Sequence, residues 1–98
     1  MPSYRLTISP QAEEDLRAIY VYGLERWGQA KSLAYLEEMK TFIWSLLELP
    51  FQGVKRPELK PHLFSKRLES HIVFYRVHID KIDIARILHA RQNAGRHL

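Results

Sequence analysis

Arginine and histidine are the side chains in this sequence whose type and spacing could serve catalysis or ligand binding. Four arginines interrupt an apolar stretch near the end of the chain, and all five histidines lie in the second half: Arg67, Arg76, Arg86, Arg91, His62, His71, His78, His89 and His97. A guanidinium binds carboxylate or phosphate through charge-assisted hydrogen bonds. The histidines show neither a helical pair four residues apart nor a nearby carboxylate motif, so their spacing predicts no metal site.

Other catalytic classes find no support in the sequence. The absence of cysteine excludes disulfides, thiolate metal sites and cysteine nucleophiles. No serine lies in a recognisable nucleophile elbow, and the four glycines form no phosphate loop. We therefore expect no cofactor, and each histidine alone is explained by solvation or by an ordinary hydrogen bond.

The charge is unevenly distributed along the chain. The formal net charge is +4, but residues 1–50 hold five Lys/Arg against seven Asp/Glu, whereas residues 51–98 hold ten against four. A basic second half is typical of a protein with an anionic partner. The alternative is ordinary surface solvation with chance asymmetry.

The first half of the chain is expected to form a strand and a helical hairpin. Tyr4–Ile8 alternates like a short strand, and Ser9 with Pro10 gives a helix start. Gly28 is typical of a helix end, and a second helix is expected over Gln29–Leu49. The apolar steps of three and four residues are these: Ala12, Leu16, Ile19, Tyr20, Gly23, Leu24 and Trp27 in the first helix, and Leu33, Leu36, Met39, Ile43, Leu46 and Leu47 in the second.

The second half is expected to form three strands after an irregular loop over Phe51–Leu63. Strands joined by tight turns must run antiparallel. The order β-α-α-β-β-β predicts an α+β fold in one domain, residues 1–98, with an antiparallel sheet packed against the helical hairpin. The expected strands are Phe64–Glu69, Ile72–Ile79 and Ile82–Ala90, with turns at Ser70-His71 and Asp80-Lys81 and a frayed tail or one helical turn over Gln92–Leu98.

Alternation along the last strand divides its side chains between two faces. Arg86 falls among the apolar residues expected against the helices, where a partly buried arginine needs a carboxylate from Glu13, Glu14 or Asp15. The more solvent-facing side chains include His89 and Arg91, which could form a basic patch with Arg67; the face of Arg76 stays open. Two aromatic residues lie off the main helical stripes, Tyr22 as a solvent or partner contact and Trp44 as a core plug or a partner contact.

Five fragments in the right order carry a resemblance to a known family. They cover nearly the whole chain: Tyr4–Ile19, Glu25–Gly28, Gly53–Leu59, Ile72–Val77 and Ile87–Arg91. Together they resemble ParE-type toxins of the RelE/ParE superfamily, found in bacterial type II toxin–antitoxin modules. The family fold, a helical hairpin against an antiparallel sheet, agrees with the order of elements above.

The resemblance implies a toxin that inhibits DNA gyrase, arrests growth and acts by binding. It also implies a ParD-like antitoxin, encoded alongside, whose ribbon-helix-helix part binds DNA and whose C-terminal segment folds along the toxin. We then expect DNA contact only through the antitoxin. Partner or target contacts are expected at Arg67, His89, Arg91, Tyr22 and Trp44.

Two alternatives stay open at this point. RelE-like relatives cut messenger RNA on the ribosome, and Arg67 and Arg91 match their phosphate-binding arginines. Their C-terminal tyrosine aligns near His97, and their lysine cluster is represented only by Lys60 and Lys66. The second alternative is a non-toxic module that only binds an antitoxin. Without cysteine, a signal sequence or a long apolar run, a cytoplasmic location is expected.

Overall fold

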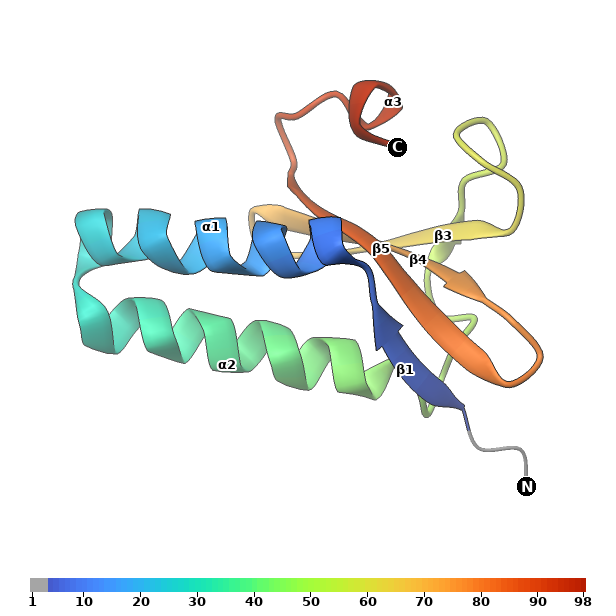
Figure 1. Cartoon of the computed structure of the whole chain (residues 1–98), viewed down its shortest axis with the longest axis horizontal. Helices are drawn as coiled ribbons and strands as arrows, with labels where there is room; N and C mark the ends of the chain where they lie inside the picture. Colours follow the sequence, from blue (N-terminus) through green and yellow to red (C-terminus); the bar gives the residue numbers. More distant parts are fainter. Residues whose placement is uncertain (1–3) are drawn as a thin grey trace.

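The computed structural model describes residues 4–98; the first three residues, part of the N-terminal stretch in which no signal sequence is expected, lie outside the described part. Two long helices lie side by side against a layer of strands, and the chain ends in a short third helix (Figure 1). In chain order the elements are β1 (Arg5–Ile8), α1 (Pro10–Trp27), α2 (Gln29–Ser45), β2 (Val54–Lys55), β3 (Leu63–Leu68), β4 (His71–Val77), β5 (Lys81–His89) and α3 (Ala94–His97).

The predicted ends of the first helix are confirmed. The Ser9 hydroxyl accepts a hydrogen bond from the backbone N–H of Ala12 at 3.0 Å, which satisfies one of the unpaired donors of the first turn. At the other end Gly28 has a φ of 88°, a left-handed conformation that glycine adopts without a steric penalty. Because α2 begins at the next residue, the two helices must form a tight antiparallel hairpin.

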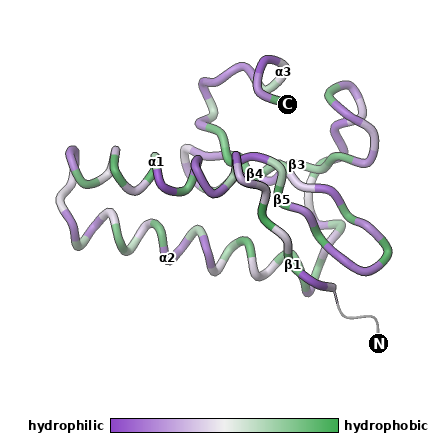
Figure 2. Tube along the Cα trace, in the orientation of Figure 1, coloured by the Kyte–Doolittle hydropathy of each residue, from purple (hydrophilic) through white to green (hydrophobic). Residues whose placement is uncertain are grey.

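The two helices approach each other closely at one point, and glycine makes this possible. A side chain at Gly23 would place its Cβ 2.4 Å from the hydroxyl of Ser32 on α2. That buried hydroxyl instead donates a hydrogen bond of 2.7 Å to the carbonyl of Tyr20. Hydrophilic and hydrophobic residues both occur within successive turns of the two helices (Figure 2), as expected for helices with one buried side.

The second helix is shorter than predicted. It ends at Ser45 instead of Leu49, because the following residues form bonds to the third residue back, such as Leu46 N–H to the Ile43 carbonyl at 3.1 Å. Its buried face also lies slightly off the predicted stripe. Leu33 was expected inside but is 44% exposed, whereas Ser32, which was not expected inside, is buried; Tyr35 is buried as expected beside the main stripe.

The sheet has five strands in the order β1-β5-β4-β3-β2. The pairs β3–β4 and β4–β5 are antiparallel, as predicted for strands joined by tight turns. β1 differs from the expectation of a wholly antiparallel sheet, because it runs parallel to β5 with Arg5 opposite Lys81. β2 was not predicted at all; Val54 and Lys55 lie within the expected loop and pair with the edge of β3.

Both hairpin turns lie close to the predicted positions, but not at them. The first turn is Glu69-Ser70 rather than Ser70-His71, so that His71 opens β4 opposite Leu68. Glu69 takes a φ of 51°, a conformation that such short turns often require. The second turn precedes Lys81, with the His78 N–H donating to the Lys81 carbonyl at 2.8 Å.

A β-bulge in β5 overturns the predicted division of its side chains. Phe74 pairs with Arg86 and Tyr75 pairs with Ile84, which leaves Ala85 as an extra residue. An extra residue reverses the alternation beyond it. Beyond Ala85, the side chains predicted to face the helices therefore lie on the opposite face. Those predicted to face solvent turn toward the helices instead.

Each face of the sheet carries its own apolar cluster. The face against α1 and α2 packs Tyr75, Ile84 and Ile87 with helix residues such as Met39 and Ile43. We call the opposite side the outer face; its buried cluster is Leu63, Phe74 and Leu88, and Ala94 and Leu98 pack against it from the C-terminal segment. One helical turn near the C-terminus is thus confirmed.

Candidate functional site

A groove runs between α1 and the end of β5, and we call it the α1–β5 groove. It consists of two adjoining hollows of about 390 and 270 Å³ that share Ile19, Tyr22, His71 and His89. The larger hollow is also lined by Asp15, Ala18, Ile87 and Gln92, and the smaller by Arg26, Trp27, Tyr35, Ser70 and Arg91.

The start of α1 fixes the floor of this groove. Where β1 ends, residues at the start of α1 form hydrogen bonds to the edge of β5 that β1 no longer covers. Ser9 donates from its N–H to the Ile84 carbonyl at 3.0 Å and from its hydroxyl to the Ala85 carbonyl at 2.7 Å. The Asp15 carboxylate then accepts a hydrogen bond of 2.9 Å from the N–H of Ile87. A carboxylate thus satisfies a strand edge that a neighbouring strand would otherwise pair.

Asp15 also neutralises Arg86, which confirms the predicted structural role and identifies the carboxylate among three candidates. Nε and one terminal nitrogen of Arg86 each lie 2.8 Å from an Asp15 oxygen. The two side chains are only 20% and 14% exposed. The hydrogen bonds that Arg86 donates to Asp15 raise the pKa of the guanidinium. Arg86 itself lies opposite Phe74 on the outer face, not against the helices as predicted.

A row of aromatic rings and imidazoles crosses the smaller hollow. Trp27 meets Tyr35 edge to face at 6.1 Å between ring centroids, and the Tyr35 hydroxyl lies 2.7 Å from Nδ1 of His71. His71 lies directly opposite His89 across the two strands, with ring centroids 5.4 Å apart. Burial, with Glu69 and Glu38 nearby, raises the pKa of Tyr35 to about 12. Burial, and then the neighbouring His89, lowers the pKa of His71, so Tyr35 and His71 favour their uncharged forms at neutral pH.

The smaller hollow is basic at its rim. Its lining residues are apolar, aromatic, histidine or arginine apart from Ser70. The Arg26 guanidinium lies 5.2 Å from the ring centre of Tyr22, a side chain that is 54% exposed. Arg91 follows β5, and its backbone N–H donates to Nδ1 of His89 at 3.1 Å. Arginine and imidazole N–H groups around aromatic walls can bind a carboxylate beside an apolar side chain.

Three of the five predicted contact residues meet in this groove, and two do not. Tyr22, His89 and Arg91 line the smaller hollow together. His89 was predicted to face solvent, but the bulge at Ala85 turns its side chain toward the helices. The other two predicted residues lie outside the lining of the groove, as follows from their positions in β3 and α2.

Arg67 lies opposite Ile72 on the outer face, and its Nε donates to the backbone carbonyl of Glu69 at 2.6 Å. Trp44 is 59% exposed on α2, so it does not plug an edge of the core. His97 lines a hollow on the outer face. The three residues of the ribonuclease alternative, Arg67, Arg91 and His97, are therefore not brought into one hollow.

The sequence did not point to several residues of the groove. Trp27 was assigned to the core stripe of the first helix, His71 to a turn, and Arg26 to no role. His71 had a detectable signal, because it alternates with Val73 and Tyr75, which face the helices. The β5 side of the groove depends on the bulge at Ala85, and no local sequence pattern indicates that bulge.

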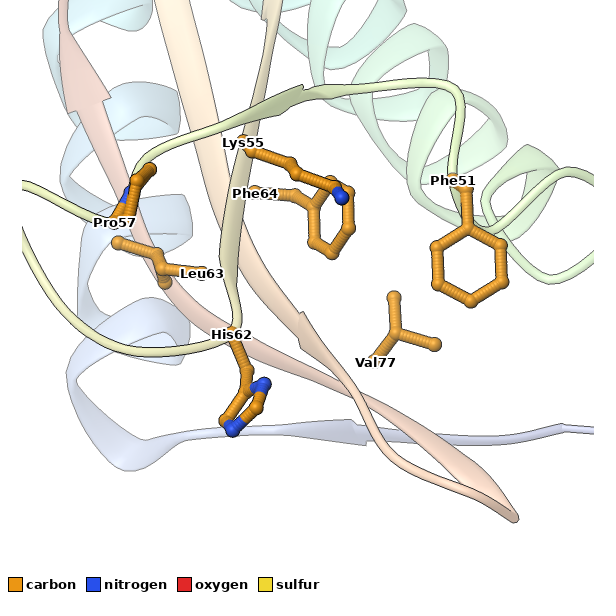
Figure 3. Close-up of a pocket in the computed structure, with 7 residues that line it drawn as sticks. All are labelled: Phe51, Lys55, Pro57, His62, Leu63, Phe64 and Val77. Carbon is orange, nitrogen blue, oxygen red and sulfur yellow. The ribbon is translucent and has the colours of Figure 1, made fainter.

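A separate apolar hollow of about 320 Å³ lies near β2 at the other end of the sheet. Phe51, Phe64 and Val77 surround it, with Lys55 and His62 at its border (Figure 3). None of the predicted contact residues lies there. Across residues 4–98 no cluster of three or more histidine, aspartate or glutamate side chains is placed to hold a metal, and no helix in that range has the length and apolar character to cross a membrane.

Comparison with known protein families gives a direct result. Residues 6–94 match the model of the ParE toxin of the type II toxin–antitoxin system parDE. Among curated proteins, Toxin ParE1 of Caulobacter vibrioides is 36% identical over 98 residues, all of this chain and 99% of that protein. Toxin ParE1 of Mycobacterium tuberculosis is 33% identical over 97 residues, covering 98% of this chain and 99% of the relative.

Solved structures agree with these relatives. A chain of the chromosomal ParDE TA system from P. aeruginosa superposes with a TM-score of 0.78 at 27% identity, covering 89% of this chain and 96% of that one. A chain of the toxin–antitoxin complex RelBE2 from Mycobacterium tuberculosis shares the fold, with a TM-score of 0.66 at 18% identity over 94% of this chain and 97% of that one. The chain therefore belongs to the ParE toxin family of type II toxin–antitoxin systems.

Proposed function

We propose that this ParE-type toxin acts on DNA gyrase by binding and is held inactive by a ParD-like ribbon-helix-helix antitoxin. Family membership and the similarity to a ParDE system support both parts of the proposal. The structural observation that carries it is the α1–β5 groove, which offers an apolar floor and a basic rim at adjoining positions. Gyrase is a cytoplasmic enzyme, so the toxin would act in the cytoplasm.

The shape and chemistry of the groove suit an amphipathic helix from the antitoxin. A helix that binds in a groove contributes apolar anchors on one side, and Ala18, Ile19 and Ile87 supply the surface for them. Its acidic residues would face Arg26 and Arg91. Opposite charges across an interface fix the orientation of the partner and speed its association.

Binding rather than cleavage is also supported by the separation of the ribonuclease candidates. Cleavage of RNA needs phosphate-binding groups and an acid around one phosphate. Arg91 lines the groove, His97 lines a hollow on the outer face, and Arg67 is engaged with the Glu69 carbonyl. This arrangement gives no specific reason to prefer the ribonuclease alternative.

A gyrase assay tests the proposal. Purified toxin should block negative supercoiling by gyrase and accumulate cleaved DNA, and an equimolar amount of the antitoxin encoded beside it should prevent both effects. Programmed ribosomes incubated with the same toxin should keep their message intact. Unaffected gyrase at high toxin excess, or message cleavage that is lost in Arg91→Ala, would contradict the proposal.

Induction in cells separates a toxin from a module that only binds. Growth should stop when the chain is induced alone and resume when the antitoxin is induced afterwards. Continued growth at a confirmed level of soluble toxin would favour the non-toxic alternative instead.

A further inference from the structure

The outer face of the sheet carries a hollow of about 290 Å³ that is separate from the α1–β5 groove. Three basic side chains line it, Lys60 from the turn before β3, Arg76 from β4 and Arg86 from β5. His97 and Gln11 add further polar groups, and Asp83 is its one acidic side chain.

The basic side chains of this hollow outnumber its one acidic side chain, Asp83, which lies opposite Arg76 in the β4–β5 pairing. Arg86 is neutralised by Asp15, and Asp83 is already bonded to the Thr7 hydroxyl and lies 3.7 Å from the His78 ring. Within residues 4–98 the side chains of Arg76 and Lys60 form neither an ion pair nor a hydrogen bond. Although Asp83 lies across from Arg76, neither cation is bonded within the described chain, so both can bind an incoming anion.

Arg76 is held in place although it forms no ion pair with the carboxylate opposite it, Asp83. It lies within β4, between Leu63 on one neighbouring strand and Asp83 on the other, and it is half-buried. A half-buried guanidinium has given up part of its hydration, and an incoming anion can compensate for that loss. Lys60, also half-buried, would add a point charge on the same anion.

Further cations extend the basic surface across the outer face. The Arg56 guanidinium lies 5.8 Å from the ring centre of Phe74, and one of its nitrogens donates to the Ser65 hydroxyl at 3.2 Å. Arg67 points from the same face at the other end of β3. Cations spread over neighbouring strands match a row of phosphates better than one small anion.

We propose that the outer hollow binds the phosphate backbone of duplex DNA, with Arg76 and Lys60 as the contacts. The choice of DNA over RNA rests on the proposed action on gyrase, whose substrate is duplex DNA. The proposal departs from the expectation that DNA is contacted only through the antitoxin. Successive residues of β4 point to opposite faces, so an antitoxin in the α1–β5 groove leaves Arg76 accessible.

Fluorescence anisotropy with a labelled 20-base-pair duplex tests this, using the full chain alone and in complex with its antitoxin. Arg76→Gln and Lys60→Gln should each weaken binding several-fold. Each should also reduce the slope of log affinity against log salt by about one, as expected for the loss of one phosphate contact. The matched control is Lys40→Gln, which removes the same charge from an exposed position on α2 and should leave both quantities unchanged.

Thermal unfolding and antitoxin affinity are measured on every variant, and both should match those of the unmodified chain. An equal loss in Lys40→Gln would assign the binding to net charge and overturn the proposal, as would the absence of binding at low salt. Arg76-dependent binding to single-stranded RNA but not to duplex DNA would overturn it too. If gyrase is unaffected by the toxin while Arg76-dependent DNA binding persists, the proposed target fails and this site stands.

Discussion

The two ends of β5 are built differently, and the difference separates scaffold from site. Residues 81–84 lie between two strands, with β1 parallel on one side and β4 antiparallel on the other. Residues 86–89 have β4 on one side only, and α1 takes the place of the missing strand. Residues 81–84, the near end, are therefore held by backbone pairing on both sides. Residues 86–89, the far end, pair along the backbone with β4 only, and on their other side they depend on a few side chains of α1.

The bulge at Ala85 divides these two regions. Before it, Ile82 and Ile84 are completely buried against the helices. After it, Arg86 and Leu88 turn to the outer face, while Ile87 and His89 turn toward the α1–β5 groove. Bulges often redirect side chains next to functional sites, and here one extra residue gives a single strand a role on both faces.

The largest effect is expected at Asp15, because the far end depends on it. Asp15→Asn keeps the shape but leaves Arg86 without its counter-charge, since the amide is uncharged. Removal of one partner of a largely buried pair costs about 3 kcal/mol. Urea unfolding measures the change in the free energy of unfolding. A loss below about 1 kcal/mol would show that the two ends of β5 are not held differently.

A smaller loss is expected at the near end. Thr7→Val removes the hydroxyl that bonds Asp83 across the β1–β5 pair, while the backbone pairing of both strands remains. A hydrogen bond to a charged group contributes about 1.5–3 kcal/mol, but Asp83 is partly exposed and regains water, so we expect about 1 kcal/mol. The same urea experiment gives the comparison; a loss equal to that of Asp15→Asn would remove the distinction between the two ends.

A third effect is a dependence of stability on pH. Burial lowers the pKa of His71 in the folded chain below its usual value of 6.5. As the pH falls below about 6.5, the unfolded chain therefore takes up a proton that the folded chain does not. Stability should decrease on acidification from pH 6.5, by at most about 1.4 kcal/mol per pH unit for this proton. This ceiling holds only if the folded chain stays fully unprotonated at His71, so we expect a smaller change than this ceiling near pH 6.5.

His71→Gln should flatten that part of the stability profile, since the amide does not titrate and can still hydrogen-bond Tyr35. His62→Gln, in the loop before β3, is the matched control. Urea unfolding at several values between pH 5 and pH 7.5 provides the measurement. An unchanged acid slope in His71→Gln would mean that other groups dominate it.

Local signals in the sequence predicted much of the scaffold. The Ser9-Pro10 helix start, the glycine at position 28 and the need of Arg86 for an acidic neighbour are each visible within a few residues or from a single charge. Three of the predicted contacts, Tyr22, His89 and Arg91, also meet in one groove.

The remaining features depend on contacts between distant segments. The parallel pairing of β1 with β5 joins residues that are 76 positions apart, as Thr7 with Asp83. The bulge at Ala85 is set by how β4 and the start of α1 fit around β5, and alanine carries no sign of it. For this reason the alternation rule gave the right faces up to Ile84 and the wrong faces beyond it.

The affinity of the toxin for its antitoxin, measured by isothermal titration calorimetry, tests the central claim most directly. If the far end of β5 forms the binding groove, Tyr22→Ala and Arg91→Ala should each weaken the complex about tenfold or more, since aromatic and arginine anchors carry much of the energy of an interface. Trp44→Ala, which removes an exposed aromatic side chain outside the groove, should leave the affinity unchanged. Unchanged affinity in both groove variants, with a loss in Trp44→Ala, would contradict the account.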